Sequence, residues 1–302
     1  MTGNKMLGKQ TIDNTIDNTI DNTMNRIATS ILAAVAAIAA TAQTADIVVS
    51  YDSQRRNWET DSLTTTKMTL LANANEAKYF NDISLWADSL SATPEGKKQY
   101  QQIIMAACMT QMPDGSISID LRKGPVKKVD TYVFSNLGDG NLRYYSMFGD
   151  EQLYYDEPLD EMQWSIGDSL QNIMGFECIL AETDYHGRHW EAWFTPDIPV
   201  SFGPWKLRGL PGLILKASAE TGFVFTATGI EKTDRKLSAM YSAENYQKAD
   251  RKKALAQHEH FLNNREAYLS ARHNGSVKFE YNISDRPKFN AAKYAIEPDY
   301  AD

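Results

Sequence analysis

Short segments in which apolar and polar residues alternate recur along the chain from residue 46 onwards. Alternation with a period of two places successive side chains on opposite faces of a strand, and these segments are rich in β-branched and aromatic residues. They cover residues 46–51, 67–72, 130–134, 142–148, 152–155 and 162–166. The Leu-Gly-Asp-Gly sequence at 137–140 separates two of them and is typical of a hairpin turn. The pattern therefore predicts short, mainly antiparallel strands.

Two stretches break this pattern and predict helices. Residues 93–112 have Thr93 as a candidate N-cap and Pro94 at the first helical position, and a Pro-Asp-Gly sequence follows them. Residues 242–272 are charged and alanine-rich and predict a long C-terminal helix, either continuous or broken. Its basic stretch at 248–253 is typical of a solvated helix face rather than a binding patch.

Together these elements predict an α+β fold: a mainly antiparallel sheet with one inserted helix and one long C-terminal helix. We expect the sheet to form a curved sheet or half-barrel with a helix against its concave side, by analogy with periplasmic carriers of apolar ligands. One domain should cover residues 43–285, ending after a strand at 277–281. The polar tail at 286–302 is expected to be poorly ordered.

The N-terminal 42 residues predict export. Residues 11–22 repeat Thr-Ile-Asp-Asn three times, which suggests a disordered extension or a mis-called start over 1–23. Residues 24–42 then contain a basic residue, an apolar run and a small-x-small cleavage site, as in a signal peptide. The apolar run is shorter than the ~20 residues that span a bilayer, so we expect cleavage before Gln43 and no transmembrane span in the mature chain. The exported protein is expected either in the periplasm or in association with the outer membrane.

The charge of the chain argues against one class of partner, and its two cysteines allow two covalent states. The formal net charge is −8, and the predicted cleavage leaves it unchanged, because three basic and three acidic residues are removed. An acidic chain argues against nucleic acid as a partner, since nucleic acids select basic surfaces. Cys108 and Cys178 are the only cysteines, and in an oxidising compartment they form either a disulfide or two buried free thiols.

The stretch from Gly175 to Ile214 carries the most specific motifs. It contains Gly-Phe-Glu-Cys, then a long segment from His186 to Pro199 with Ala-Trp-Phe-Thr-Pro, then Gly-Pro-Trp-Lys at 203–206 and Gly-Leu-Pro-Gly-Leu-Ile at 209–214. In this order they resemble the GLPGLI family of exported Bacteroidetes proteins. The resemblance implies export and an accessory role beside outer-membrane transport components, but no defined biochemical activity.

The same motif has a physical interpretation. Proline and glycine fit the second and third positions of a type II turn at 210–213, where the glycine needs a positive φ. The turn would lead into a buried strand, and the upstream prolines should hold the connection extended over a sheet edge or barrel mouth. The structural motif comprises Gly203, Pro204, Gly209, Leu210, Pro211, Gly212, Leu213 and Ile214.

Trp205 has two interpretations, as a core residue or as a partly exposed anchor for a ligand or partner. Under the second interpretation its neighbours Lys206 and Arg208, together with Trp193, complete a tentative binding site.

A hairpin with His186 and Gly187 at its turn would pair Asp184 with His189, Glu182 with Glu191, and Leu180 with Trp193. Its polar face then collects the carboxylates and imidazole of an acid–base site, although such clusters on exposed hairpins are more often solvated. The other face should be the core face: Ile179, Ala181, Trp190, Ala192 and Phe194. The histidine pairs 186/189 and 258/260 point to opposite sides of a strand or helix, so we expect no metal and no cofactor.

These observations favour an exported, non-enzymatic envelope protein with a binding or accessory role. Its partner would be an envelope or outer-membrane protein, or an apolar small ligand. The alternative is a periplasmic hydrolase that uses Glu182, Glu191 and His189. The tripeptide Asp-Ser-Leu occurs three times and resembles an O-glycosylation pattern of exported Bacteroidetes proteins, which would modify Ser62, Ser89 and Ser169. The other interpretation of each tripeptide is a turn or helix cap.

Overall fold

The computed structural model describes residues 43–120, 123–159, 162–237, 240–272 and 287–301. Residues 44–302 form one compact unit. The predicted extension at 1–23, the signal peptide at 24–42 and the strand at 277–281 lie outside the described residues. Within the described residues, no helix combines the length and the apolar composition that crossing a membrane requires.

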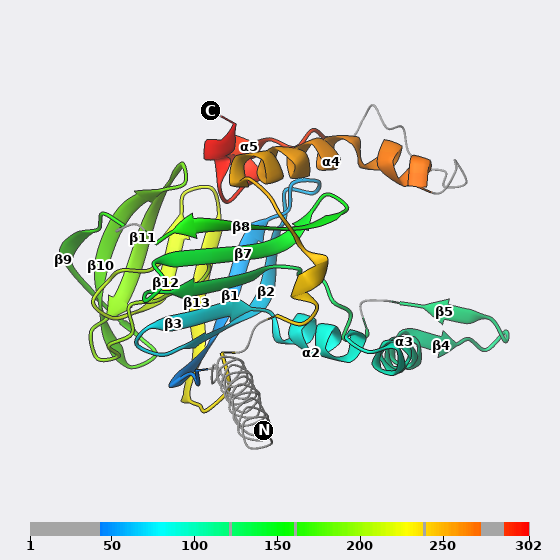
Figure 1. Cartoon of the computed structure of the whole chain (residues 1–302), viewed down its shortest axis with the longest axis horizontal. Helices are drawn as coiled ribbons and strands as arrows, with labels where there is room; N and C mark the ends of the chain where they lie inside the picture. Colours follow the sequence, from blue (N-terminus) through cyan, green and yellow to red (C-terminus); the bar gives the residue numbers. More distant parts are fainter. Residues whose placement is uncertain (1–42, 121–122, 160–161, 238–239, 273–286, 302) are drawn as a thin grey trace, which may run out of the picture. The chain divides into compact units, whose positions relative to one another are not determined.

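A twelve-stranded sheet forms the centre of this unit (Figure 1). All of its neighbouring strands are antiparallel except β14 and β8, which pair in parallel. From one edge to the other the strands are β14 (Gln247–Lys248), β8 (Glu151–Pro158), β7 (Asn141–Phe148), β6 (Tyr132–Asn136), β3 (Glu76–Phe80), β2 (Leu63–Ala72), β1 (Ile47–Arg56), β13 (Phe223–Lys232), β12 (Leu213–Ala219), β11 (Arg188–Thr195), β10 (Phe176–Tyr185) and β9 (Ser165–Ile173).

Helices and a small second sheet complete this unit. α2 (Asp82–Ser91) and α3 (Pro94–Cys108) follow β3, and β4 (Met109–Gln111) pairs with β5 (Ile117–Ile119) directly after them. The C-terminal part contains the 3-10 helix η1 (Ala243–Asn245), α4 (Arg251–Arg272), α5 (Ala291–Tyr294) and the 3-10 helix η3 (Pro298–Tyr300). As predicted, Thr93 caps α3: its hydroxyl accepts a hydrogen bond from the backbone N–H of Gly96 at 3.1 Å.

The predicted architecture is wrong in its helices. Two helices, not one, are inserted between β3 and β6. The pattern missed α2, whose N-cap is Asn81, and α3 ends at Cys108 because the chain turns there into β4. The predicted long C-terminal helix is not formed either, because η1 and β14 occupy residues 243–248 and α4 is interrupted at Asn264, which has φ −129° and ψ 19°.

The break in α4 has a local cause. The Asn264 side-chain amide donates a hydrogen bond to the His260 carbonyl oxygen at 2.8 Å. In a continuous helix this carbonyl oxygen would accept a hydrogen bond from the backbone N–H four residues later, and an asparagine side chain readily competes for it. The sheet also differs from the predicted curved sheet or half-barrel. It contains one parallel strand pair, and it is open, with β14 and β9 as its edges.

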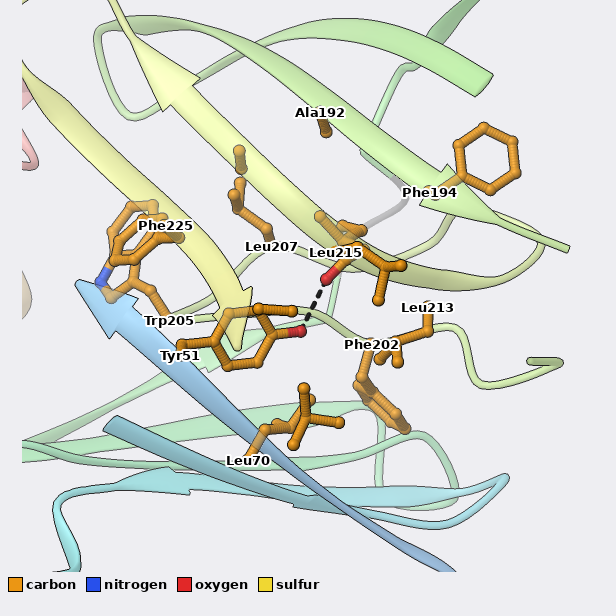
Figure 2. Packing of buried hydrophobic residues seen from close by; sticks show 14 of the residues in the cluster. Tyr51, Leu70, Ala192, Phe194, Phe202, Trp205, Leu207, Leu213, Leu215 and Phe225 are labelled. Carbon is orange, nitrogen blue, oxygen red and sulfur yellow. Dashed lines mark hydrogen bonds between the residues drawn. The ribbon is translucent and has the colours of Figure 1, made fainter. Parts of the chain in front are cut away.

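The sheet curls strongly enough to bring distant strands together. β8 and β11 are eight places apart in the strand order, which in a flat sheet would separate them by about 38 Å. Nevertheless, Nε2 of His186, at the turn between β10 and β11, lies 3.1 Å from Oε1 of Glu157 in β8. The main core lies between the facing parts of the sheet. Figure 2 shows Tyr51 of β1 within this core, where its hydroxyl donates to the Ile214 carbonyl oxygen at 2.6 Å.

Cys108 and Cys178 are both buried free thiols. Cys108 ends α3, whereas Cys178 lies in β10 within the main core. Of the two states that the sequence left open, the structure has the unpaired one.

Candidate functional site

The β10–β11 hairpin has the predicted register. Asp184 pairs with His189, Glu182 with Glu191, and Leu180 with Trp193. His186 and Gly187 at the turn have φ values of +50° and +73°, as a two-residue hairpin loop with matching twist requires. Four of the five predicted core-face residues are buried, and Ile179 is half-buried: Ala181, Trp190, Ala192 and Phe194 are at most 1% exposed.

The polar face of this hairpin is open to solvent. Nδ1 of His189 lies 2.8 Å from Oδ1 of Asp184, and its Nε2 lies 4.0 Å from Glu182. The hydrogen bond with Asp184 raises the pKa of His189. However, the side chains of His189 and Asp184 are 48% and 88% exposed, and water screens such pairs. The structure therefore brings the predicted acid–base residues together on a solvated surface.

The segment that follows β11 folds back on itself, and its residues 202–208, which we call the buried loop, are buried. Phe202 and Arg208 form a backbone bridge, and the N–H of Gly209 donates to the Ser201 carbonyl at 2.9 Å. Inside this loop Trp205 has a left-handed φ of +57° and is 5% exposed. Its ring packs 5.5 Å from that of Trp190, so Trp205 is a core residue and not an exposed anchor. Trp193 lies on the outer face of the hairpin and is half-buried.

The hexapeptide is close-packed against the end of β11. Leu210, Leu213 and Ile214 are at most 1% exposed, whereas Pro211 is exposed. The expected type II turn is not formed, because the N–H of Gly212 bonds to the Leu210 carbonyl at 2.8 Å and Gly212 has φ +159°. Glycine is required there for a different reason: a Cβ on Gly212 would lie 2.0 Å from the Thr195 carbonyl oxygen.

Lys206 is fully buried, and its ammonium group is saturated. Nζ lies 2.5 Å from Oε2 of Glu157, 2.7 Å from Oε1 of Glu297 and 3.1 Å from the Tyr155 hydroxyl. An ammonium has three donors, and each has a partner here. The rings of Tyr144, Tyr155 and Trp205 also surround Nζ, at 5.0, 4.8 and 5.5 Å from their centroids.

His186, Arg251 and Asp299 lie beside these groups and complete what we call the rim cluster. Its six members are Glu157, His186, Lys206, Arg251, Glu297 and Asp299. Arg251 Nε lies 2.7 Å from Oε2 of Glu297 and 3.1 Å from Oε1 of Glu157, and its Nη2 donates to Asp299. Nη2 also lies 2.8 Å from Nδ1 of His186. Nδ1 also lies 3.2 Å from Oδ2 of Asp299, and Nε2 of the same ring faces Oε1 of Glu157 at 3.1 Å.

The electrostatics of the rim cluster keep Glu157 ionised. Burial alone raises the pKa of this carboxyl group, but the polar contact with His186 and the charge of Lys206 outweigh burial and hold the pKa at about 2. Glu157, His186 and Glu297 have ligand atoms within 4.8 Å of one another, which is compatible with a metal ion by distance alone. The ammonium of Lys206 and the guanidinium of Arg251 already lie against both carboxylates, so the geometry suits these internal cations instead.

Sequence reasoning missed most of the rim cluster. Glu157 lies near the end of β8, Arg251 begins α4, and Glu297 lies in a segment expected to be a poorly ordered tail, yet Glu297 is 1% exposed. One signal was present in the motif itself. A lysine flanked by Trp205 and Leu207 in a buried loop requires a buried counter-charge, although no pattern indicates which acid supplies it.

The three Asp-Ser-Leu sites differ in accessibility. Ser62 and Ser169 are exposed, whereas Ser89 lies in α2, partly buried, with its hydroxyl donating to the Trp86 carbonyl at 2.7 Å. If the tripeptide directs O-glycosylation of the folded protein, protein from the native host should be heavier than protein from a heterologous host. Intact mass should show that Ser62→Ala and Ser169→Ala each remove one glycan and Ser89→Ala removes none. Equal masses from both hosts would exclude the modification.

A second lysine, Lys78, is also buried, and we expect its burial to lower the stability of the fold at neutral pH. Lys78 in β3 is 1% exposed, and its Nζ lies 4.9 and 5.3 Å from the ring centroids of Phe80 and Phe134. Burial, with a contribution from Arg235, lowers its pKa to about 8. The folded state therefore binds fewer protons than the unfolded state between pH 8 and the ordinary lysine pKa, and wild-type stability rises with pH across that window.

Lys78→Met should accordingly raise the free energy of unfolding by about 1 to 3 kcal/mol at pH 7, measured by urea denaturation. The gain should shrink as pH rises above 8. The matched control is Lys67→Met, which removes a lysine whose side chain is 74% exposed and should change stability by less than about 0.5 kcal/mol. A Lys78→Met variant less stable than wild type would show that the ammonium stabilises the fold.

Comparisons with known proteins add one family match. The model of a family described as "Protein of unknown function (Porph_ging)", which is associated with Porphyromonas and Bacteroidetes, matches residues 180–216. None of the curated proteins compared matches the chain. Two structures of PNGF-II, in the C2 and P21 space groups, are each 15% identical to it, with TM-scores of 0.46 and 0.43. They cover 71% and 68% of this chain, which spans about a third of theirs, 32% in both cases. The chain is thus similar, over β11, the buried loop, and parts of β10 and β12, to a family of unknown function.

Proposed function

We propose that this chain is an exported cell-envelope protein of the GLPGLI kind with a non-enzymatic binding or accessory role. Support comes from the signal-peptide pattern at 24–42 and from the family match at 180–216, which includes the hexapeptide at 209–214. In this proposal the hexapeptide and the buried loop before it build the fold. The partner is an envelope or outer-membrane protein, or an apolar small ligand.

One observation carries the non-enzymatic part of the proposal. The ionisable groups that are buried together, in the rim cluster, are bonded to one another: Lys206 uses all three donors, and Glu157 is held ionised. A general acid or base must instead exchange a proton with a substrate and needs a pKa near the working pH. The rim cluster therefore fits a structural role better than a catalytic one.

The test is expression of the full chain in a Bacteroidetes host, followed by fractionation and mass spectrometry. We expect the protein in the envelope fraction, with Gln43 as its first residue. Crosslinking in intact cells should capture a defined envelope partner. The amount of captured partner should increase with the expression level of the protein. A full-length protein confined to the cytoplasm would contradict the proposal.

The hydrolase alternative is supported by the 2.8 Å contact of His189 with Asp184, which raises the pKa of the imidazole. Purified protein should be assayed on ester, amide and glycoside substrates beside a variant with Glu182→Gln, Glu191→Gln and His189→Ala. Glu220→Gln, at another exposed acid, is the control. Turnover that the triple variant loses and the control keeps would replace the binding role with hydrolysis.

A further inference from the structure

Residues 287–301, which we call the strap, lie beside α4 at the rim of the sheet (Figure 1). The strap is attached through apolar as well as polar contacts: Phe289 packs edge-on against Trp58, with ring centroids 5.9 Å apart, and Ile296 packs against the main core. The guanidinium of Arg188 donates to the carbonyl oxygens of Ala295 and Ala291, at 2.5 and 3.4 Å. Only Ala291 and Glu297 of the strap are buried, at 8% and 1% exposure. Hydrogen bonds and charges therefore add to these apolar contacts in holding the strap in position.

Glu297 is the centre of this attachment. Its Oε1 accepts from Lys206 Nζ at 2.7 Å and from the Tyr155 hydroxyl at 3.2 Å, and its Oε2 accepts from Arg251 Nε at 2.7 Å. Two residues further on, Asp299 contacts Arg251 and lies 3.2 Å from Nδ1 of His186. Each carboxylate oxygen of Glu297 thus has a charged donor. This arrangement is typical of a preformed carboxylate-binding site.

The charge balance shows why this site needs an anion. With the strap in place, Lys206 and Arg251 face three carboxylates, those of Glu157, Glu297 and Asp299. Without the strap, the same two cations would face Glu157 alone. A buried cation that lacks a counter-charge is strongly unfavourable, so the site should be filled either by the strap or by another carboxylate.

We propose that Lys206, Tyr155 and Arg251 form a binding site for an acidic peptide, which the chain's own Glu297 occupies in the closed state. The ligand is a peptide segment with two carboxylates two residues apart, as in Glu297-Pro298-Asp299. A partner that carries such a segment displaces the strap and takes its ion pairs. This inference rests on the proposed binding function and gives that function a site and a ligand chemistry.

The test uses the full chain and a synthetic peptide of residues 290–301. Glu297→Gln removes the negative charge that holds the strap, and Asp61→Asn is the matched control, because Asp61 contacts Lys293 and Tyr294 of the same strap at the surface. Hydrogen exchange over 287–301 should accelerate at least about tenfold in Glu297→Gln, as expected for a lost charge-assisted bond, and little in Asp61→Asn.

The peptide should then bind the Glu297→Gln protein and not the wild type, whose own strap competes. A peptide with glutamine at position 297 should bind at least about tenfold more weakly. If Glu297→Gln fails to fold, the same measurements are made on Asp299→Asn, whose parent side chain is 27% exposed. Unchanged exchange, or equal binding of the two peptides, would overturn the inference. Failure to capture a partner in cells while the peptide still binds would instead contradict the proposed function alone.

Discussion

Replacing Lys206 with methionine is expected to lower the free energy of unfolding by about 3 to 5 kcal/mol at pH 7. The Lys206 side chain is fully buried between Glu157 and Glu297, whose side chains are 13% and 1% exposed. Methionine keeps most of the apolar contacts with Tyr144, Tyr155 and Trp205 but removes the ammonium, so Glu297 keeps only the charge of Arg251. Urea denaturation followed by tryptophan fluorescence measures the difference.

The pH dependence of this loss is a second part of the same prediction. The folded pKa of Glu157, about 2, is below its ordinary value of 4.5, so its contribution to stability is present above pH 4.5 and is lost as pH falls towards 2. The difference between Lys206→Met and wild type should therefore shrink over that range. Lys248→Met is the control, because Lys248 pairs with Asp156 but is 63% exposed, and its loss should be below about 1 kcal/mol. Equal losses for both variants would contradict the special role of Lys206.

Gly212→Ala is expected to destabilise the fold by about 3 kcal/mol or more, because the new methyl group would overlap backbone atoms. An ideal Cβ on Gly212 lies 2.0 Å from the oxygen and 2.6 Å from the carbon of the Thr195 carbonyl, and 3.0 Å from Cα of Pro196. Thr195 pairs with Leu213 in the β11–β12 ladder, so relief of the clash must open the end of that ladder. The thermal midpoint and the urea midpoint should both fall.

Two controls separate steric overlap from backbone strain. Gly175 has φ +90° with open space around it, so Gly175→Ala should cost about 1 kcal/mol from the left-handed backbone alone. Pro211 is exposed, and Pro211→Ala should have a smaller effect than Gly212→Ala. If Gly212→Ala costs no more than Gly175→Ala, the close approach to Thr195 is not what requires glycine.

The sequence predicted those parts of the fold that local periodicity controls. The β10–β11 register follows from the His186-Gly187 turn and the alternation on either side, and α3 begins where its N-cap and proline indicate. The hydrophobic pattern did not predict the elements whose bounds depend on contacts that it does not describe. The strand predicted at 162–166 is displaced to β9, at 165–173, a nearly fully exposed edge strand without a core pattern. The long C-terminal helix is not formed, because η1 and β14 occupy its first part and a side-chain bond of Asn264 interrupts α4, neither of which hydrophobic periodicity detects.

The candidate site was harder to predict from the sequence than the fold, because its contacts join residues that are far apart in the chain. The two interpretations of Trp205 could not be separated from sequence, because burial depends on how the loop from 201 to 209 closes. The acids that neutralise Lys206 lie 49 residues before it and 91 residues after it. They meet only because the sheet curls and the strap folds back over the rim. Chemistry that is assembled by long-range folding leaves no local motif, although the buried lysine itself indicates that a counter-charge must exist.

We infer that the family-matching loop holds the strap through the ion pair of Lys206 with Glu297. A double-mutant cycle with Lys206→Met, Glu297→Gln and the combined variant, based on urea denaturation at pH 7, measures the coupling between the two side chains. We expect a coupling free energy of about 2 kcal/mol or more, so that the combined variant is much more stable than the sum of the two single losses implies. A coupling free energy near zero would contradict the claim.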